Sequence, residues 1–353
     1  MFSCLAVELQ EGFIGLSVSK NNLFLLKIVH SLFILSGLSM SQAIQYLRVI
    51  QGQVVQYLLP PTWTRCGRPK NAYIVMPDGK SMCVRYRDPH IKLVLGEVLS
   101  FYLSRFLGMD NVPVAALSRA SPETRQWRNQ AVNMTQMHWQ NGKVVALIQW
   151  IPNLDSYSSF ARIPSLLLNA YQSNQSLTSM SLRSLTISKS DLIDLIQWGS
   201  MIIFDYLTGH YDRFASMQDG AYEQKNQKIL LDNIRNLRKS KNSKLWLIDN
   251  ESGLLDAYDL LYNDSLGGYK FRKFHADMLR TMCVFQKPVV DAIKTLHASE
   301  EPHVQLNEFA FRYDSLLQTL WSKSLFNLYE KKFKERVNDI YEWIKYCEIR
   351  NKR

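Results

Sequence analysis

Short apolar segments separated by turn residues dominate the first half of the chain, and they predict β-strands. Two of them flank Pro77-Asp78-Gly79, which is typical of the turn of a β-hairpin. Residues 93–107 carry apolar side chains on one face of a helix, and Gly108 follows as its C-terminal cap. The predicted strands comprise residues 72–76, 81–86, 112–117 and 143–150. This order of elements predicts a small sheet with one helix packed on it.

The pattern of apolar residues becomes helical after Pro152. Ser190 is the expected N-terminal cap of a helix, because Asp191 follows it in the place that favours an acid, and the apolar run continues to Leu207. Helical periodicity returns over residues 278–296 and 309–346. The sequence therefore predicts the α+β class, with a small sheet-rich lobe followed by a larger helical lobe.

The N-terminal segment, residues 1–61, belongs to neither predicted lobe. Residues 23–38 are apolar but are interrupted by a lysine and a histidine, and they are shorter than the roughly 20 residues that a membrane-spanning helix needs. They also lie too far from the N-terminus for a simple signal peptide. A membrane anchor, a buried helix and sequence from an imperfect gene model are all open interpretations. Residues 41–56 predict a helix that ends before Pro60-Pro61.

The length of 353 residues is long for one hydrophobic core and favours two lobes. We expect the sheet-rich lobe over residues 62–152 and the helical lobe over residues 153–353. Five cysteines are present, and no two stand at the CxxC spacing of zinc ribbons and redox motifs. Two disulfides in a secreted protein and five buried thiols in a cytosolic protein both agree with their wide separation.

The formal net charge of +11 is compatible with nucleic acid, an anionic membrane surface or acidic substrates. Much of this charge lies in residues 235–244, which contain five cations and no acid. The segment lacks interleaved aromatic residues, so it offers no stacking platform for single-stranded nucleic acid. We interpret it as a solvated loop and expect no nucleic-acid partner.

Two acidic residues of the second half stand just after apolar segments. Asp212 comes after the predicted helix that contains residues 202–207, and Asp249 directly follows a short strand-like segment, residues 245–248. Metal-assisted phosphoryl transfer needs two carboxylates in one cleft. One orients the nucleophilic hydroxyl, and the other holds the cation that bridges the phosphates. We therefore predict that Asp212 and Asp249 form the centre of a phosphoryl-transfer site.

The smaller lobe adds a cation and an acid to this hypothesis. Arg85 lies on the second predicted strand and Glu97 on the predicted helix, so the two can pair across the sheet and hold phosphates. A strand-edge cation and a solvated helix acid are their ordinary structural interpretations. His210, close to Asp212, is interpreted as support for the loop rather than as the general base.

Several motifs are specific when taken together: Cys66-Gly67-Arg68-Pro69-Lys70-Asn71, Cys83-Val84-Arg85-Tyr86, Tyr211-Asp212-Arg213, Ile248-Asp249-Asn250-Glu251-Ser252-Gly253-Leu254 and Cys283-Val284-Phe285. They resemble the four-jointed box kinase family from about residue 62 to the C-terminal region. Members of this family are atypical kinases that phosphorylate Ser or Thr in the Golgi lumen, and their substrates are extracellular cadherin domains of the Fat and Dachsous type. The resemblance implies an atypical protein-kinase-like two-lobe fold and such cadherin domains as partners.

The resemblance also implies a role for each candidate residue. Asp212 is the catalytic-loop acid that takes or orients the proton of the substrate hydroxyl. Asp249 holds a divalent cation, Mg²⁺ or Mn²⁺, and Glu251 completes an Asp-Asn-Glu motif that supports this metal site. Glu97 is the helix acid of the small lobe, and Arg85 occupies the position of the phosphate-clamping lysine of kinases. The implied cofactors are ATP and the divalent cation.

Two features depart from the kinase pattern. The usual Gly-rich phosphate loop is absent from the sequence. In kinases an Asn five residues after the catalytic Asp binds a second cation, and here that position is Met217, whose thioether is too soft for Mg²⁺ or Mn²⁺. Gln218 or Asp219 replaces this Asn in one interpretation. In the alternative, the chain is a pseudokinase, a binding module for cadherin domains or nucleotide.

The resemblance implies a type II membrane protein with a signal anchor. This chain departs from that pattern, because it shows no clean anchor, and residues 23–38 are the one possible candidate. The implied location is the Golgi lumen or outside the cell, where disulfides persist. The expected pairs are Cys66–Cys83 and Cys283–Cys347, with Cys4 free, although four cysteines allow three pairings.

Overall fold

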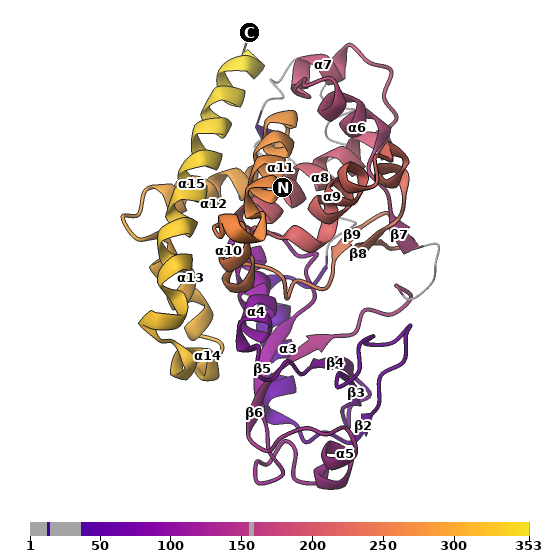
Figure 1. The fold of residues 1–353 in the computed structure, drawn as a ribbon, viewed down its shortest axis with the longest axis vertical. Helices are drawn as coiled ribbons and strands as arrows, with labels where there is room; N and C mark the ends of the chain where they lie inside the picture. The colour runs from indigo at the N-terminus through magenta and orange to yellow at the C-terminus, as the bar shows by residue number, and fades with distance from the viewer. Residues whose placement is uncertain (1–12, 15–36, 155–158, 353) are drawn as a thin grey trace, which may run out of the picture.

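The computed structural model describes residues 13–14, 37–154 and 159–352. Cys4 and all but the last two residues of the apolar segment 23–38 lie outside the described residues. Within the described ranges, no helix is long and apolar enough to cross a membrane. The strands of the larger sheet gather at one end of the molecule and most helices at the other (Figure 1), so the α+β class is confirmed.

Five antiparallel strands form the sheet of the smaller lobe, in the order β2-β3-β4-β6-β5. At the predicted turn between β3 and β4, Gly79 has a φ of +81°, which side chains disfavour. Arg85, the last residue of β4, lies opposite Ala146 of β6. The strands are β2 (Tyr57–Leu59), β3 (Ala72–Val75), β4 (Ser81–Arg85), β5 (Ala115–Ala120) and β6 (Lys143–Gln149).

Helix α4 (Ile91–Phe106) lies between this sheet and the helical lobe (Figure 1). It contacts β5 and β6 on one side and α10 and α13 on the other, so residues 94–105 are all buried. A side chain at Gly96 would place its Cβ 2.5 Å from the carbonyl oxygen of Gly253. Glycine therefore lets α4 approach the segment that carries Asp249. The other helices of this lobe are α3 (Met40–Gly52) and α5 (Ala131–Gln136).

Helix α8 (Lys189–Thr208) is the central helix of the larger lobe and contacts α11, α15 and β10. Its N-terminal cap is Ser188 rather than the predicted Ser190, because the Ser188 hydroxyl accepts a hydrogen bond from the Asp191 amide. Gly209 ends the helix with a φ of +67°. The other α-helices are α6 (Ser165–Gln172), α7 (Ser179–Arg183), α9 (Ser216–Glu223), α10 (Leu255–Leu261), α11 (Gly268–Thr281), α12 (Lys287–His297), α13 (Pro302–Phe311), α14 (Ser315–Leu320) and α15 (Lys323–Lys352).

The two C-terminal segments of helical periodicity are interrupted in the structure. Residues 278–296 include the end of α11, the strand β10 (Phe285–Gln286) and most of α12. Pro288 lies in the first turn of α12, where its missing N–H is harmless, whereas it would break a continuous helix. Strand β10 pairs with β1 (Phe13–Ile14). Residues 309–346 are divided among α13, α14 and α15, because the Asp314 side chain caps the start of α14.

Residues 235–239, the first half of the basic segment 235–244, belong to a strand, so the prediction of a solvated loop is wrong for this half. Strand β8 (Ile234–Lys239) lies between β7 (Phe160–Ala161) and β9 (Leu245–Leu247). Its cations bind acids of neighbouring elements: Lys239 Nζ lies 2.9 Å from Asp194 Oδ1. Lys244 Nζ, just before β9, lies 2.7 Å from Asp110 Oδ1. These pairs allow a basic sequence to form part of a packed sheet.

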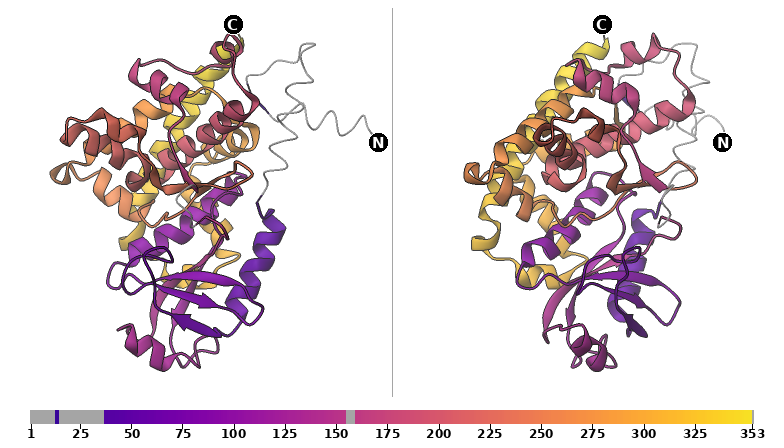
Figure 2. Two further views of the ribbon diagram at one scale, coloured as in Figure 1. Left: turned by 90° about the vertical axis from the view of Figure 1, so that its right-hand side faces the viewer. Right: turned by 45° about the vertical axis from the view of Figure 1, so that its right-hand side comes forward.

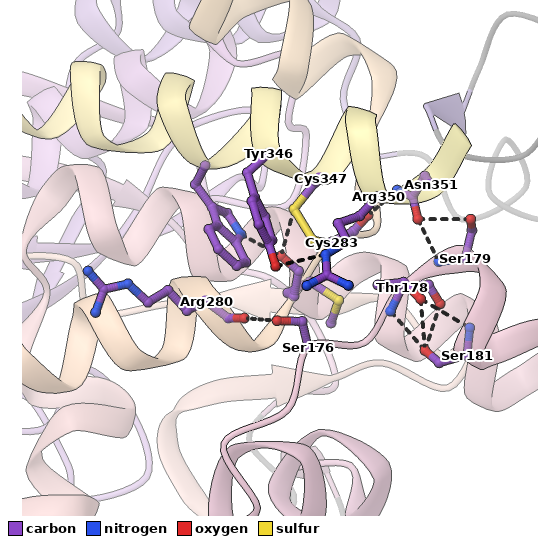
Figure 3. Close-up of a disulfide and its surroundings, with 12 residues drawn as sticks. Ser176, Thr178, Ser179, Ser181, Arg280, Cys283, Tyr346, Cys347, Arg350 and Asn351 are labelled. Atoms are coloured by element: carbon purple, nitrogen blue, oxygen red, sulfur yellow. Dashed lines mark hydrogen bonds between the residues drawn. A yellow bond between two sulfur atoms is a disulfide. The ribbon is translucent and has the colours of Figure 1, made fainter. Parts of the chain in front are cut away.

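Two disulfides join Cys66 to Cys83 and Cys283 to Cys347, which confirms the predicted pairs. The second bond fastens α15 to the segment before β10 (Figure 3). Close to it, Asn351 Nδ2 donates a hydrogen bond of 3.0 Å to the carbonyl oxygen of Cys283. Helix α15, which runs along the outer side of the helical lobe (Figures 1 and 2), is thereby fixed to the lobe's core.

Candidate functional site

The segment after β9 turns sharply and presents Asp249 and Glu251 toward the smaller lobe. Asp249 has a φ of +57°, and its carbonyl oxygen accepts a hydrogen bond of 3.0 Å from His210 Nε2. Asn250 is fully buried, and its Nδ2 donates to the carbonyl oxygen of Leu247 at 3.0 Å. The backbone of this segment is therefore held from both sides, which fixes the directions of the neighbouring carboxylates.

Three of the predicted acids contact the guanidinium of Arg85, the last residue of β4. Its Nη1 contacts Asp249 Oδ1 and lies 2.8 Å from Glu251 Oε2. Its Nε lies 3.6 Å from Glu97 Oε2, on α4. The structure thus brings four candidate residues together, although they come from three elements far apart in the sequence.

Burial and charge shift the pKa values of these groups in different directions. Burial raises the pKa values of Asp249 and Glu251, but the charges and hydrogen bonds of Arg85 and the neighbouring arginines together outweigh it and hold both carboxyls below their usual range. Burial raises the pKa of Glu97 to about 7, against the opposing effect of Arg85. Near neutral pH, Glu97 is therefore the acid of this cluster that most readily takes up a proton.

Asp212 lies at the start of the short π-helical segment η2 (Tyr211–Ala215), directly after the end of α8. Its φ of −97° and ψ of 18° fall in the sparsely populated bridge region, where active-site residues are often found. Burial, followed by the charge of Asp249, raises the pKa of the Asp212 carboxyl. Asp212 and Asp249 therefore belong to one electrostatic cluster. The half-buried Asp212 is linked to the segment of Asp249 by two intermediate side chains.

The first of these side chains is Asn236 of β8. Its Nδ2 donates to the carbonyl oxygen of Asp212 at 2.7 Å and to Asp212 Oδ2 at 3.1 Å. The second is Arg213, whose Nη2 donates to Asn250 Oδ1 at 2.7 Å and whose Nε donates to the carbonyl oxygen of Asn236 at 3.1 Å. Arg213 also forms an ion pair with buried Asp205, so its guanidinium is fixed in place.

His210 supports the Asp249 segment and is poorly suited to proton transfer. Burial, followed by the Arg213 charge, holds the pKa of His210 well below its usual range, so the ring is neutral. The His210 carbonyl oxygen accepts a hydrogen bond of 3.2 Å from His275 Nε2 on α11. These contacts agree with the interpretation of His210 as a residue that supports the loop.

Sequence reasoning missed Asn236 and a second group of residues at the edge of the small lobe. Arg87 Nε and Nη2 lie 2.7 and 3.2 Å from the two oxygens of Glu251, and Arg87 Nη1 donates to Asn71 Oδ1 at 2.7 Å. Arg68 Nη1 lies 3.5 Å from Glu251 Oε1, with 63% of its side chain exposed. Arg68 and Asn71 belong to the Cys66–Asn71 motif. The presence of this motif and the Asp-Asn-Glu motif in the same sequence was the signal that could have placed Arg68 and Asn71 near Glu251.

The Cys66–Cys83 disulfide holds this motif against β4, two residues before Arg85. We expect removal of the bond, by Cys66→Ala with Cys83→Ala, to lower stability by about 3 kcal/mol, as for a loop of this length. We also expect about a tenfold loss of ATP affinity, because Arg68 and Asn71 lose their fixed positions. Thermal unfolding and nucleotide titration measure the two effects.

The second disulfide provides a matched control for that experiment. Removing Cys283–Cys347 opens a longer loop, of 64 residues in separation, at the far end of α15. The double alanine variant of this pair is expected to lose stability but to keep its ATP affinity. Equal loss of ATP affinity in both double variants would mean that the Cys66–Cys83 bond has no local effect on the site.

Arg85 lies among the carboxylate oxygens that would hold a divalent cation at Asp249. Within the described residues, no group of three or more His, Cys, Asp or Glu side chains is arranged to hold a metal ion. Arg85 contacts one carboxylate oxygen of Asp249. The Asp249 side chain is nevertheless 33% exposed, so a cation from solvent can reach it. Glu97 Oε2 is buried and accepts no hydrogen bond from a described residue. Carboxylate oxygens are the ligands that Mg²⁺ and Mn²⁺ prefer, so the donor set is suitable once Arg85 moves from Asp249.

Met217, in α9, is partly buried and packs against the hydrophobic core. Asp219 is ion-paired with Lys270 at 2.6 Å, between Asp219 Oδ1 and Lys270 Nζ. The Gln218 Oε1 atom is buried without a hydrogen-bond donor among the described residues. The pairing of Asp219 with Lys270 argues against its use as a cation ligand in place of Asn.

Comparisons with known proteins identify both the family and the fold. The profile of the four-jointed box protein middle domain matches residues 41–350. The chain is 29% identical over 285 residues to Four-jointed box protein 1 of Xiphophorus maculatus, a match that covers 80% of this chain and 62% of that protein. It is 28% identical over 277 residues to the Drosophila melanogaster extracellular serine/threonine protein kinase four-jointed, with 66% and 46% covered. The chain spans about three fifths or less of the length of the curated relatives it matches.

The structure is also similar to a solved kinase. The crystal structure of the Golgi casein kinase with Mn/ADP bound superimposes with a TM-score of 0.51 at 10% sequence identity. The match covers 88% of this chain and 78% of that chain. At this identity the similarity concerns the fold, and it confirms the predicted kinase-like fold.

Proposed function

The chain belongs to the four-jointed box protein family, and we propose that it is a protein serine/threonine kinase that transfers the γ-phosphate of ATP. The observation that carries this proposal is the convergence of Asp249, Glu251 and Glu97 on the Arg85 guanidinium. Asp212, whose pKa responds to the Asp249 charge, supplies the second carboxylate that phosphoryl transfer requires.

In this mechanism the substrate hydroxyl oxygen attacks the γ-phosphorus, and the bond from that phosphorus to the bridging oxygen of ADP breaks. Asp212 orients the hydroxyl and accepts its proton. Asn236 keeps the Asp212 carboxylate directed toward the hydroxyl through its two hydrogen bonds. The divalent cation, held by Asp249 with support from Glu251, neutralises negative charge on the phosphates when it is bound.

Arg85 has two positions in this proposal. Without nucleotide it contacts Asp249, which leaves Asp249 less available to a cation. A guanidinium binds phosphate oxygens in pairs, so the phosphates of ATP draw Arg85 away from Asp249. Its buried neighbour Glu97 keeps the guanidinium near the site in both positions.

We further propose that the substrates are extracellular cadherin domains of the Fat and Dachsous type, and that the protein acts in the Golgi lumen or outside the cell. The family resemblance supports this substrate class, and the two disulfides suit an oxidising compartment. The test is transfer of labelled γ-phosphate from ATP to a purified cadherin domain. Labelling of Ser or Thr is expected, and its absence with every cadherin domain tried would contradict the substrate class.

Kinases have an Asn five residues after the catalytic Asp, where this chain has Met217. We propose that the side-chain amide of Asn236 takes the role of that Asn. Its side chain already binds Asp212, and its Oδ1 accepts no hydrogen bond from a described residue. We expect Asn236→Ala to lower kcat by about 100-fold, because Asp212 loses its orientation. Asn236→Asp, which keeps an oxygen atom but loses the donor, tests whether the donated bond is the important one. An unchanged kcat in Asn236→Ala would remove this residue from the mechanism.

The second candidate function is that of a pseudokinase that binds cadherin domains or nucleotide without turnover. Met217 is the observation that favours it. If Asn236 supplies the missing amide, Met217→Asn is expected to change kcat by less than about threefold. A gain of tenfold or more would mean that the natural site is incomplete, and it would favour the second candidate. Phosphate transfer by the two proteins at equal concentration measures the difference.

A further inference from the structure

A cavity of about 230 Å³ lies in the small lobe, between the N-terminal end of α4 and the strands β5 and β6. Its apolar wall is formed by Ile91 and Val94 of α4 and by Val144 of β6. Its charged wall contains three cations, Arg87, Arg119 and Lys143. None of these six residues is a candidate ligand of the nucleotide or the metal in the mechanism above.

The cations of the cavity have more hydrogen-bond donors than the described residues use. Arg119 Nη1 donates to the carbonyl oxygen of Gly142 at 3.0 Å, and no other described residue accepts from this guanidinium. Lys143 Nζ lies 2.8 Å from Asp88 Oδ1, and Asp88 is the one acid among the residues that line the cavity. Arg87 is also paired with Glu251, outside the lining, so an anion would meet mainly the unused donors of Arg119 and Lys143.

Arg87 connects this cavity to the candidate site. Its side chain is 9% exposed, and its Nε lies 2.7 Å from Glu251 Oε2. Arg85 Nη1 lies 2.8 Å from the same Glu251 oxygen, so the two guanidiniums share one carboxylate. An anion in the cavity would compete with Glu251 for Arg87 and so change how firmly Arg87 holds Glu251.

We propose that this cavity binds the phosphorylated side chain of a peptide, phosphoserine or phosphothreonine. The phosphate oxygens accept charge-assisted hydrogen bonds from the unused donors of Arg119 and Lys143. The apolar wall formed by Ile91, Val94 and Val144 suits the carbon atoms of the phosphorylated side chain. The choice of a phosphorylated side chain rests on the proposed function, because a kinase and its substrates carry such groups. Binding there is linked to the nucleotide site through Arg87 and Glu251.

The test is a binding titration of the whole chain, without nucleotide, with a short peptide that contains one phosphothreonine between glycines and alanines. We expect a micromolar Kd, and an affinity at least tenfold lower for the same peptide with threonine. Arg119→Ala with Lys143→Ala is expected to weaken phosphopeptide binding at least tenfold. Because no phosphate transfer is measured, the result does not depend on whether the chain is an active kinase.

Lys331→Ala with Lys334→Ala is the matched control, since it removes two cations from α15, at the other end of the chain. This control is expected to bind the phosphopeptide normally, and thermal unfolding verifies that both double variants are folded. Equal binding of both peptides, or unchanged binding by the Arg119 and Lys143 variant, would overturn the proposal. Inorganic phosphate that binds as tightly as the phosphopeptide would overturn the assignment to a phosphorylated side chain.

Discussion

Asp249→Asn is expected to lower kcat/KM for phosphate transfer by at least about 1,000-fold. The amide that replaces the carboxylate has no negative charge, so it neither holds the divalent cation firmly nor pairs with Arg85. Transfer of labelled phosphate from ATP to a cadherin domain, at several concentrations of Mn²⁺, measures the effect. More Mn²⁺ should restore only a small part of the activity.

Asp259→Asn is a matched control for this experiment. Asp259 lies in α10 and contacts Lys92 in a partly exposed pair, so the same change of charge occurs outside the site. The control should keep nearly full activity, since exposed pairs contribute little to stability. If Asp249→Asn also retains full activity, Asp249 is not a metal ligand in the reaction.

Asp212→Asn is expected to lower kcat by about 100-fold to 10,000-fold, with a smaller effect on the KM for ATP. The reason is that the amide cannot accept the proton of the substrate hydroxyl, whereas nucleotide binding depends on other residues. Transfer rates at saturating ATP separate the two parameters. A large rise in KM with an unchanged kcat would assign Asp212 to nucleotide binding instead.

The raised pKa of Asp212 predicts the form of the pH dependence. A general base is active when ionised, so activity should rise as the pH increases through the raised pKa and then level off. The hydrogen bond from Asn236 lowers this pKa, so Asn236→Ala should move the acid limb of the kcat/KM profile to higher pH. A profile that moves to lower pH in this variant would contradict the arrangement of the two side chains.

The sequence predicted the small lobe well, because local signals there agreed with one another. Pro77-Asp78-Gly79 specified a turn, and the segments on either side formed β3 and β4. The apolar face of residues 93–107 became α4, which carries Glu97. The helical lobe was predicted less accurately, since periodicity alone does not locate breaks such as the one before Pro288.

Long-range contacts explain most of the errors. The cations of residues 235–244 indicated a solvated loop. In the structure Lys239 and Lys244 form ion pairs with carboxylates on α8 and near β5. These partners are distant in the sequence, so the local pattern does not indicate them. Asn236 was missed for the same reason, because it lies in the misassigned segment, 24 residues after Asp212. Arg87 was missed because nothing near it in the sequence indicates that its partner is Glu251, 164 residues away.

We propose that Asp212 and Asp249 face one nucleotide and its cation in a single site. The most direct measurement is anomalous diffraction from crystals grown with Mn²⁺ and a non-hydrolysable analogue of ATP. We predict a manganese peak bonded to the Asp249 carboxylate, with Arg85 released onto the phosphates and Asp212 facing the terminal phosphate. Manganese and nucleotide bound elsewhere, with Arg85 still paired to Asp249, would contradict the account.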